Sequence, residues 1–236
     1  MVTIPSLLIL LLTVSCSSAE PTCVMQGICG MNENGVVPCL VSKEPHKFED
    51  SSDVLKILKD ECPELMSKGG AEIPNVCCSP DDVLKMQKSI DLVSSILTAC
   101  TACAKNVKEI ICHLHCAPNQ LEFMEVTKSM TAPNGTAIAS LNYFISKESL
   151  EASWKICALV PNFQKFVSIT GCDKNCGVAD WVRVFGMRKA MSPIEMELKM
   201  IPKGESVTVN GKKGVPVEFL VQKCADSNSC SDVCPY

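Results

Sequence analysis

The sequence predicts an α+β domain that is rich in disulfides, with helices packed around a small mixed β-sheet. Three observations lead to this prediction: many cysteines behind a leader-like start, helical periodicity in the middle of the chain, and strand-like alternation near its end. The 236 residues contain no internal repeat and no linker-like stretch, so a single domain is expected.

The first 19 residues (1–19) have the character of a signal peptide. Residues 7–12 are aliphatic, a run too short to span a bilayer, and Ser18-Ala19-Glu20 resembles a signal-peptidase site. Cleavage there leaves residues 20–236 as the mature domain. Such a chain is expected in the secretory pathway, in the lysosomal or endosomal lumen or outside the cell.

The cysteine count agrees with an oxidising compartment. The chain has 17 cysteines, and removal of Cys16 with the leader leaves an even number, all of which can pair. Each bridge contributes about 2–4 kcal/mol, chiefly by restricting the unfolded chain. Asn134-Gly135-Thr136 is a glycosylation sequon at Asn134, which fits the same routing.

Charge and hydropathy exclude several classes of partner. The formal net charge is -4, both signs are mixed and no basic block occurs, which argues against a nucleic-acid partner. Beyond the leader, no uninterrupted apolar run comes near the roughly 18 residues of a membrane span. A membrane segment, if the protein has one, is therefore expected beyond Tyr236.

The first half of the mature chain predicts a turn-rich start and two helices. Residues 23–39 carry three cysteines and several glycines, which predicts loop and turn. Residues 52–58 have helical apolar spacing. The clearest helix begins at Ser79-Pro80-Asp81-Asp82, which supplies an N-cap, a proline at the first helical position and acid in the first turn. Its apolar stripe is Val83, Met86, Ile90, Val93 and Leu97.

The second half predicts two more helices and then strands. A cysteine-bearing helix is expected over residues 100–116, and a third long helix over residues 141–159. After Pro161, residues 206–209 and 215–220 alternate as strands do, with the turn signal Asn210-Gly211 between them. Met196, Leu198 and Met200 predict a further strand.

Two motifs have both a chemical and a structural interpretation. Cys100-Thr101-Ala102-Cys103 and Cys112-His113-Leu114-His115-Cys116 look like a zinc or redox site in isolation, but in an oxidising lumen their thiolates are consumed as disulfides. We therefore expect no metal. The two histidines are interpreted as surface or capping groups, with acid sensing as the alternative.

No catalytic motif is present. The sequence has neither Gly-x-Ser-x-Gly nor His-Glu-x-x-His and only three histidines, so no enzyme activity, catalytic residue or cofactor is expected. Adjacent Cys77 and Cys78 cannot easily pair with each other. They should therefore reach two different segments and clamp the start of the main helix from two sides.

Taken together, the cysteine motifs resemble the N-terminal lumenal domain of Niemann-Pick type C sterol transporters over residues 23–236. The residues that carry the resemblance are Cys23-x5-Cys29-Gly30, Cys39, Glu61-Cys62-Pro63, Cys77-Cys78, Cys100-x2-Cys103, Cys112-x-Leu114-x-Cys116-x-Pro118-x-Gln120, Asp180-Trp181 and Cys230-x3-Cys234. The resemblance implies helices around a small mixed sheet, and a sterol held with its 3β-hydroxyl deep in a pocket.

The resemblance also implies a disulfide pairing. The implied pairs are Cys23 with Cys77, Cys29 with Cys39, Cys62 with Cys112, Cys78 with Cys116, Cys103 with Cys157, Cys172 with Cys176, Cys224 with Cys230, and Cys100 with Cys234. The last two pairs are the least defined, because two cysteines that the family usually has before Cys230 are absent.

The implied sterol site departs from the family at its polar end. The family holds the sterol hydroxyl with an asparagine and a glutamine, at the positions of Pro38 and Asp82 here. Pro38 offers neither a side-chain polar group nor an N–H, whereas Asp82 can either accept from the hydroxyl or only cap the helix with Ser79. The implied apolar wall is Met25, Ile28, Val83, Met86, Leu141, Tyr143, Pro193 and Ile194.

Three functions remain open at this stage. The first is a cholesterol-like sterol carrier in intracellular or gut sterol transport and uptake, exchanging ligand with a soluble lumenal carrier. The second is a repurposed module that binds another lipid or a protein partner, as Pro38 suggests. The third is a vitamin-carrier-like receptor domain, for which only Trp154 and Trp181 would be available for stacking.

Overall fold

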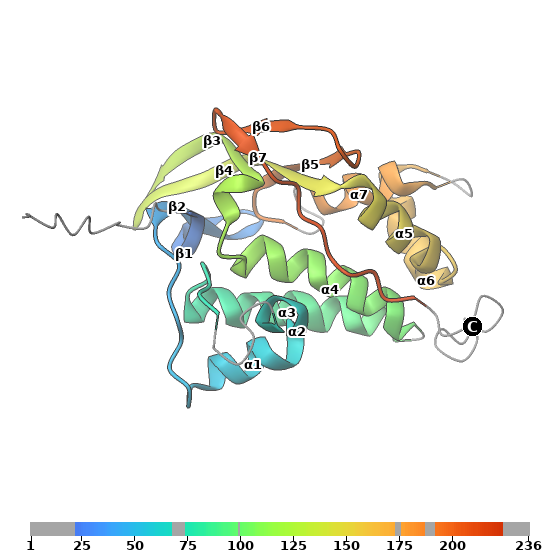
Figure 1. Cartoon of the computed structure of the whole chain (residues 1–236), viewed down its shortest axis with the longest axis horizontal. Helices are drawn as coiled ribbons and strands as arrows, with labels where there is room; N and C mark the ends of the chain where they lie inside the picture. Colours follow the sequence, from blue (N-terminus) through green and yellow to red (C-terminus); the bar gives the residue numbers. More distant parts are fainter. Residues whose placement is uncertain (1–21, 68–73, 99, 173–175, 187–191, 224–236) are drawn as a thin grey trace, which may run out of the picture.

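A computed structural model describes residues 22–67, 74–98, 100–172, 176–186 and 192–223. The expected leader and Cys224, Cys230 and Cys234 lie outside these residues, so the two pairings that involve them are not described. The fold is α+β and disulfide-rich, as predicted. The sheet lies along one side of the paired helices α3 (Pro80–Ile96) and α4 (Thr101–Cys116), and α5, α6 and α7 gather at one end (Figure 1).

The sheet is mixed and is organised around one central strand, β4 (Gly135–Ser146). Strand β3 (Met124–Ala132) pairs antiparallel with one edge of β4. The other edge has two partners in succession: β2 (Gly35–Lys43) contacts it at Ala137, and β5 (Glu195–Ile201) runs parallel to it from Ser140 onward. Strand β1 (Cys23–Asn32) pairs with β2, outside it.

Helices α1, α3 and α4 begin within one residue of where the sequence predicts, whereas α2, α6 and α7 were not predicted. Ser52 caps α1 (Asp53–Glu61), and the short α2 (Pro63–Ser67) follows. Ser79 caps α3 with a complete capping box, in which Asp82 reaches back to the Ser79 backbone. Helices α5 (Lys147–Cys157), α6 (Pro161–Val167) and α7 (Val178–Gly186) connect β4 to β5. Short 3₁₀ turns lie at Gln120–Glu122 and Ser168–Thr170.

The loop predicted over residues 23–39 is wrong, because these residues form the β1–β2 hairpin. The glycines that suggested loop have specific positions in it. Gly27 lies at a register shift with φ of 75°, and Gly35 ends the two-residue turn. Both positions need a positive φ, which glycine adopts at little cost, so the glycines mark a bulge and a turn rather than irregular chain.

The helix predicted over residues 141–159 is also partly wrong. Residues 141–146 belong to β4, and the helix starts only after Ser146, whose side chain accepts from the Ser149 N–H. β4 is buried on both faces along this stretch. A strand covered on both sides has a continuous apolar run, and such a run cannot be told from a helix by periodicity.

The last strands are shorter than expected. β6 (Val207–Val209) pairs with β7 (Lys212–Gly214) across Asn210-Gly211, so the turn was predicted correctly but the second strand lies before residues 215–220. Only Val217 of that later segment makes a bridge, to Ile145. Strand β5 at Met196, Leu198 and Met200 is confirmed, whereas β3 was not anticipated.

Six of the implied disulfides are present in the described residues: Cys23–Cys77, Cys29–Cys39, Cys62–Cys112, Cys78–Cys116, Cys103–Cys157 and Cys172–Cys176. Cys77 reaches the start of β1, and Cys78 reaches the end of α4. The start of α3 is therefore clamped from two sides, as expected. Cys103, Cys112 and Cys116 are all bridged, so their thiolates are not free to bind zinc.

Candidate functional site

A cavity of about 340 Å³ opens where the edge of β4 changes partner from β2 to β5. Helices α3 and α4 and the end of α7 close it from the other sides. It is lined by Met25, Asn34, Val36, Pro38, Asp82, Lys85, Ser89, Leu92, Ile111, Leu114, His115, Phe185, Ser192, Pro193, Ile194 and Met196. Its size is at the lower end of the roughly 300–1,000 Å³ typical of small-molecule sites.

Helix α3 presents one stripe of side chains to the core and the adjacent stripe to the cavity. Val83, Met86 and Ile90 are fully buried in the core, as the apolar periodicity predicts. The cavity stripe, Asp82, Lys85, Ser89 and Leu92, has the same spacing shifted by one residue. It is largely polar, so an apolar pattern could not reveal it. The sequence signal for this stripe was its spacing of three, four and three residues, which is the spacing of the apolar stripe displaced by one position.

Asp82 is buried at the start of α3, and its two oxygens have different roles. Oδ2 accepts from the Gly27 N–H at 2.6 Å, from the Ser79 N–H at 2.9 Å and from the Ser79 hydroxyl at 2.6 Å. The bulge at Gly27 thus turns a β1 donor toward the helix. Oδ1 has one contact within the described residues, with Lys85 Nζ at 4.0 Å. Asp82 therefore caps the helix with one oxygen and lines the cavity.

Gln120 joins two walls of the cavity. Its Oε1 accepts from the N–H groups of Val24 and Met25, and its Nε2 donates to the carbonyls of Leu114 and His115. The residue is fully buried, so these bonds are shielded from water. Gln120 fixes Met25 of β1 relative to the last turn of α4, which explains in structural terms why it belongs to the cysteine motif.

Three ionisable side chains meet at the Asp82 end of the cavity. Burial lowers the pKa of His115 to about 4, with Asp82 opposing and Lys85 adding to the shift. Burial also lowers the pKa of Lys85, against the attraction of Asp82 and Asp81. His115 is therefore neutral from pH 5 upward and can both donate and accept a hydrogen bond.

The structure brings together five of the ten side chains expected at the sterol site. Met25, Pro38, Asp82, Pro193 and Ile194 line the cavity. Ile28, Val83, Met86, Leu141 and Tyr143 do not line it. Of these five, all but Ile28 are core residues exposed by 1% or less. Ligand contact itself stays a prediction for the whole set.

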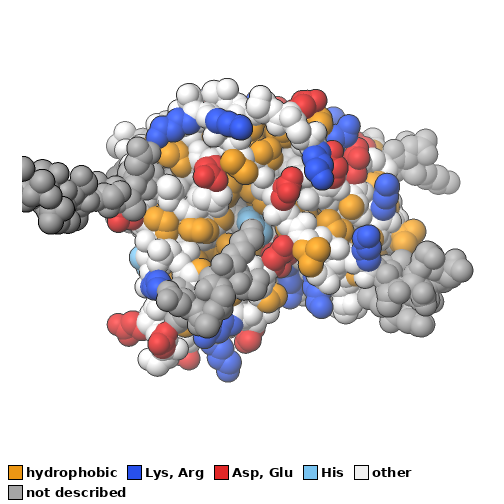
Figure 2. Space-filling view, viewed as in Figure 1, with side chains coloured by type: hydrophobic (Ala, Val, Ile, Leu, Met, Phe, Trp, Pro, Cys, Tyr) orange, Lys and Arg blue, Asp and Glu red, His pale blue; other side chains and the backbone are white. Residues whose placement is uncertain are grey.

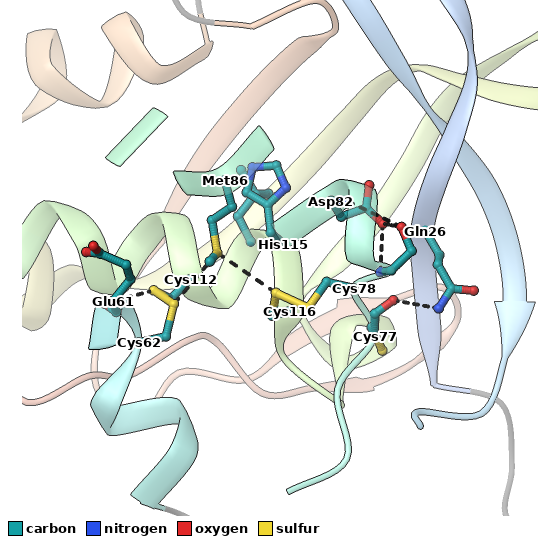
Figure 3. Close-up of a disulfide and its surroundings, with 12 residues drawn as sticks. Gln26, Glu61, Cys62, Cys77, Cys78, Asp82, Met86, Cys112, His115 and Cys116 are labelled. Carbon is teal, nitrogen blue, oxygen red and sulfur yellow. Dashed lines mark hydrogen bonds between the residues drawn. A yellow bond between two sulfur atoms is a disulfide. The ribbon is translucent and has the colours of Figure 1, made fainter. Parts of the chain in front are cut away.

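Met86 lies against the disulfides instead. Its sulfur is 3.7 Å from Cys62 Sγ and 3.9 Å from Cys116 Sγ, and Figure 3 shows it pointing to both bridges from the helix that begins near Asp82. Gln26 supports the same clamp by donating to the Cys77 carbonyl at 3.0 Å. The polarisable thioether fills an irregular space between sulfurs.

The surface interpretation of the two α4 histidines is wrong for His113, whereas His115 is partly exposed. His113 is only 3% exposed, and its Nδ1 lies 2.9 Å from the Glu109 carbonyl one turn earlier. His115 points to the opposite side, into the cavity. Both orientations follow from the helical repeat, because side chains two positions apart lie on nearly opposite faces of a helix.

The outer surface has no block of one charge sign on the face drawn in Figure 2, where Lys and Arg alternate with Asp and Glu. Among the described helices, none has both the length and the apolar character to cross a bilayer. Asn134 is exposed in the two-residue turn between β3 and β4, where its side chain donates to the Ile28 carbonyl.

Fold and site together define a disulfide-stapled α+β domain with an open cavity whose walls are mainly apolar and whose charged groups gather at one place. Comparison with known families gives a match to the family described as Niemann-Pick C1 N terminus over residues 20–235. The chain belongs to this family.

Three of the relatives are named as cholesterol transporters. The chain is 25% identical over 212 residues to the human NPC1-like intracellular cholesterol transporter 1, which covers 83% of this chain and 15% of that protein. It is 22% identical to the Caenorhabditis elegans NPC intracellular cholesterol transporter 1 homolog 1, over 76% of this chain and 14% of that protein. It is 26% identical to the Sus scrofa NPC intracellular cholesterol transporter 1, over 64% of this chain and 12% of that protein. The chain thus spans a small fraction of each relative's length.

Proposed function

We propose that this chain holds one sterol-like lipid in the cavity between α3, α4 and the β1–β2 hairpin, as a binding domain of sterol transport rather than as an enzyme. The observation that carries the proposal is the cavity itself, with apolar walls and polar groups around Asp82. Family membership and the cholesterol transporters among its relatives support the same ligand class.

The physical driving force is removal of the ring system from water. Each square ångström of apolar ligand surface buried gains roughly 25 cal/mol, and a rigid ring system loses little entropy on binding. Met25, Val36, Leu114, Phe185 and Ile194 supply apolar surface on different sides of the cavity. Asp82 Oδ1 provides an acceptor for the hydroxyl at the polar end.

The proposal places the domain in a lumenal or extracellular compartment, where its six described disulfides are stable. A lumenal position also suits exchange of ligand with a soluble sterol carrier. Such a carrier is proposed as a partner together with the sterol.

Filling the cavity tests the proposal. Radiolabelled cholesterol should bind the purified wild-type chain saturably, and Ser89→Phe, which adds a ring to the cavity stripe of α3, should weaken binding at least tenfold. Ser95→Phe is the matched control, because Ser95 is exposed on the same helix, lies outside the cavity and makes a similar hydroxyl-to-carbonyl bond. No saturable binding of any sterol to the wild type would reject the proposal.

A second candidate is a cavity adapted to another lipid. The observation that favours it is the pair Pro38 and Lys85, an apolar residue and a charged one in the lining. Native mass spectrometry of protein purified from its own source distinguishes the two. A bound mass equal to a sterol supports the first function, and another lipid supports the second.

A further inference from the structure

The polar end of the cavity offers a ligand one unused acceptor. Asp82 Oδ2 is occupied by three donors, from Gly27 and Ser79. Within the described residues, Oδ1 has only the 4.0 Å contact with Lys85 Nζ, which is longer than a hydrogen bond. Oδ1 therefore keeps its accepting capacity toward the cavity.

Lys85 offers the matching donors. It lies one turn after Asp82 in the cavity stripe, and its side chain is 26% exposed. A lysine ammonium has three N–H donors, and a 4.0 Å ion pair between neighbours on one helix contributes little stability. Burial of the ammonium has a cost, seen in its lowered pKa, that the contact with Asp82 does not fully offset. A ligand oxygen would offset more of it.

Pro38 of β2 cannot supply this donor. Pro38 lines the cavity and, as a proline, has neither an N–H nor a polar side-chain atom. Lys85 and Asp82 lie on α3, across the cavity from Pro38. His115 lies on α4, close enough to both that their charges shift its pKa. The charged partners of a ligand thus come from the helices, and Asn34 of the β1–β2 turn, whose buried Nδ2 has no hydrogen-bond partner in the part of the chain that the structure describes, also lines the cavity.

We propose that Lys85 Nζ and Asp82 Oδ1 hold the ligand's hydroxyl as a donor–acceptor pair, and that Lys85 is a specificity-determining residue for a hydroxylated lipid. An oxygen about 2.8 Å from each atom bridges their 4.0 Å separation, accepting from the ammonium and donating to the carboxylate. An anionic head group fits less well, because it would face Asp82. This inference rests on the proposed function and names the chemistry of that same cavity.

The test compares two ligands that differ only in the hydroxyl, 5α-cholestan-3β-ol and 5α-cholestane, on the full chain. Lys85→Met should lower affinity for the alcohol about tenfold or more, the size expected of a hydrogen bond to a charged group, and leave affinity for the hydrocarbon unchanged. Lys85→Arg keeps donors and should retain part of the preference. Lys88→Met is the matched control, because Lys88 is exposed on the same helix outside the cavity.

The outcomes separate this inference from the proposed function. The inference is wrong, and Lys85 is only a structural residue, if the wild type binds the alcohol but Lys85→Met lowers the affinity for both ligands equally. The same holds if Lys85→Met changes the affinity for neither ligand. Tighter binding of cholesterol sulfate than of cholesterol, lost in Lys85→Met, would also overturn it in favour of an anionic ligand. Absence of binding to either steroid by the wild type rejects the proposed function itself.

Discussion

Acid should destabilise the folded domain through His115, and the effect can be worked out from its position. Burial lowers the pKa of His115 from 6.5 to about 4. Below pH 6.5 the unfolded chain takes up a proton that the folded chain does not, so the stability that His115 contributes is present at neutral pH and is lost as the pH falls toward 4. At about 1.4 kcal/mol per pH unit, the loss between pH 7.5 and pH 5 reaches about 2 kcal/mol. Because His115 is partly exposed and lines an open cavity, we expect between about 1 and 2 kcal/mol.

The assay is equilibrium unfolding in guanidinium chloride with the disulfides intact, at pH 7.5 and pH 5, for the wild type and for His115→Gln. Glutamine keeps the polarity but does not titrate. Other groups with shifted pKa values, such as His46, are common to both proteins and cancel in the comparison. The free energy of unfolding of His115→Gln should fall less on acidification, by the amount above. Parallel pH dependence of the two proteins would refute the reasoning.

Three further predictions concern the supports of the site and the surface. Gln120→Leu leaves the N–H groups of Val24 and Met25 buried without an acceptor, so the free energy of unfolding in the same assay should fall by about 2–5 kcal/mol. A decrease of less than about 1 kcal/mol would show that the fold does not require the Gln120 hydrogen bonds. Ser79→Ala removes the N-cap of α3 and a donor to Asp82, so it should cost about 1 kcal/mol and weaken sterol binding; unchanged binding would mean that Asp82 is oriented without Ser79. Asn134 should carry a glycan in a secretory host, so peptide-N-glycosidase should shift the wild type on a gel but not Asn134→Gln, and a wild type that does not shift contradicts it.

Local signals in the sequence were sufficient for helices α1, α3 and α4 and for strand β5, but not for the rest of the sheet. The start of α3 could be predicted from Ser79-Pro80 because capping is decided by residues within one turn. β4 was taken for a helix from residue 141 because tertiary burial on both faces removes the alternation that identifies a strand. The β1–β2 hairpin was missed because Gly27, at a bulge, and Gly35, beside the turn, look in sequence like the glycines of an irregular loop.

The candidate site shows the same limit. The family resemblance led to Asp82 and Pro38, which do line the cavity. The same resemblance also led to Val83 and Met86, which belong instead to the core stripe one residue away, as their apolar periodicity indicates. Lys85 and His115 were not selected, since a lysine or a histidine on a helix is usually exposed, and only the three-dimensional neighbours show that this lysine borders a cavity.

The most direct test of the whole account is an experimental structure of the chain soaked or crystallised with cholesterol. The account predicts density for four fused rings between α3 and the β1–β2 hairpin, with the sterol hydroxyl within hydrogen-bond distance of Asp82 Oδ1 and Lys85 Nζ. A cavity filled by the protein's own side chains, or a sterol bound elsewhere, would contradict it.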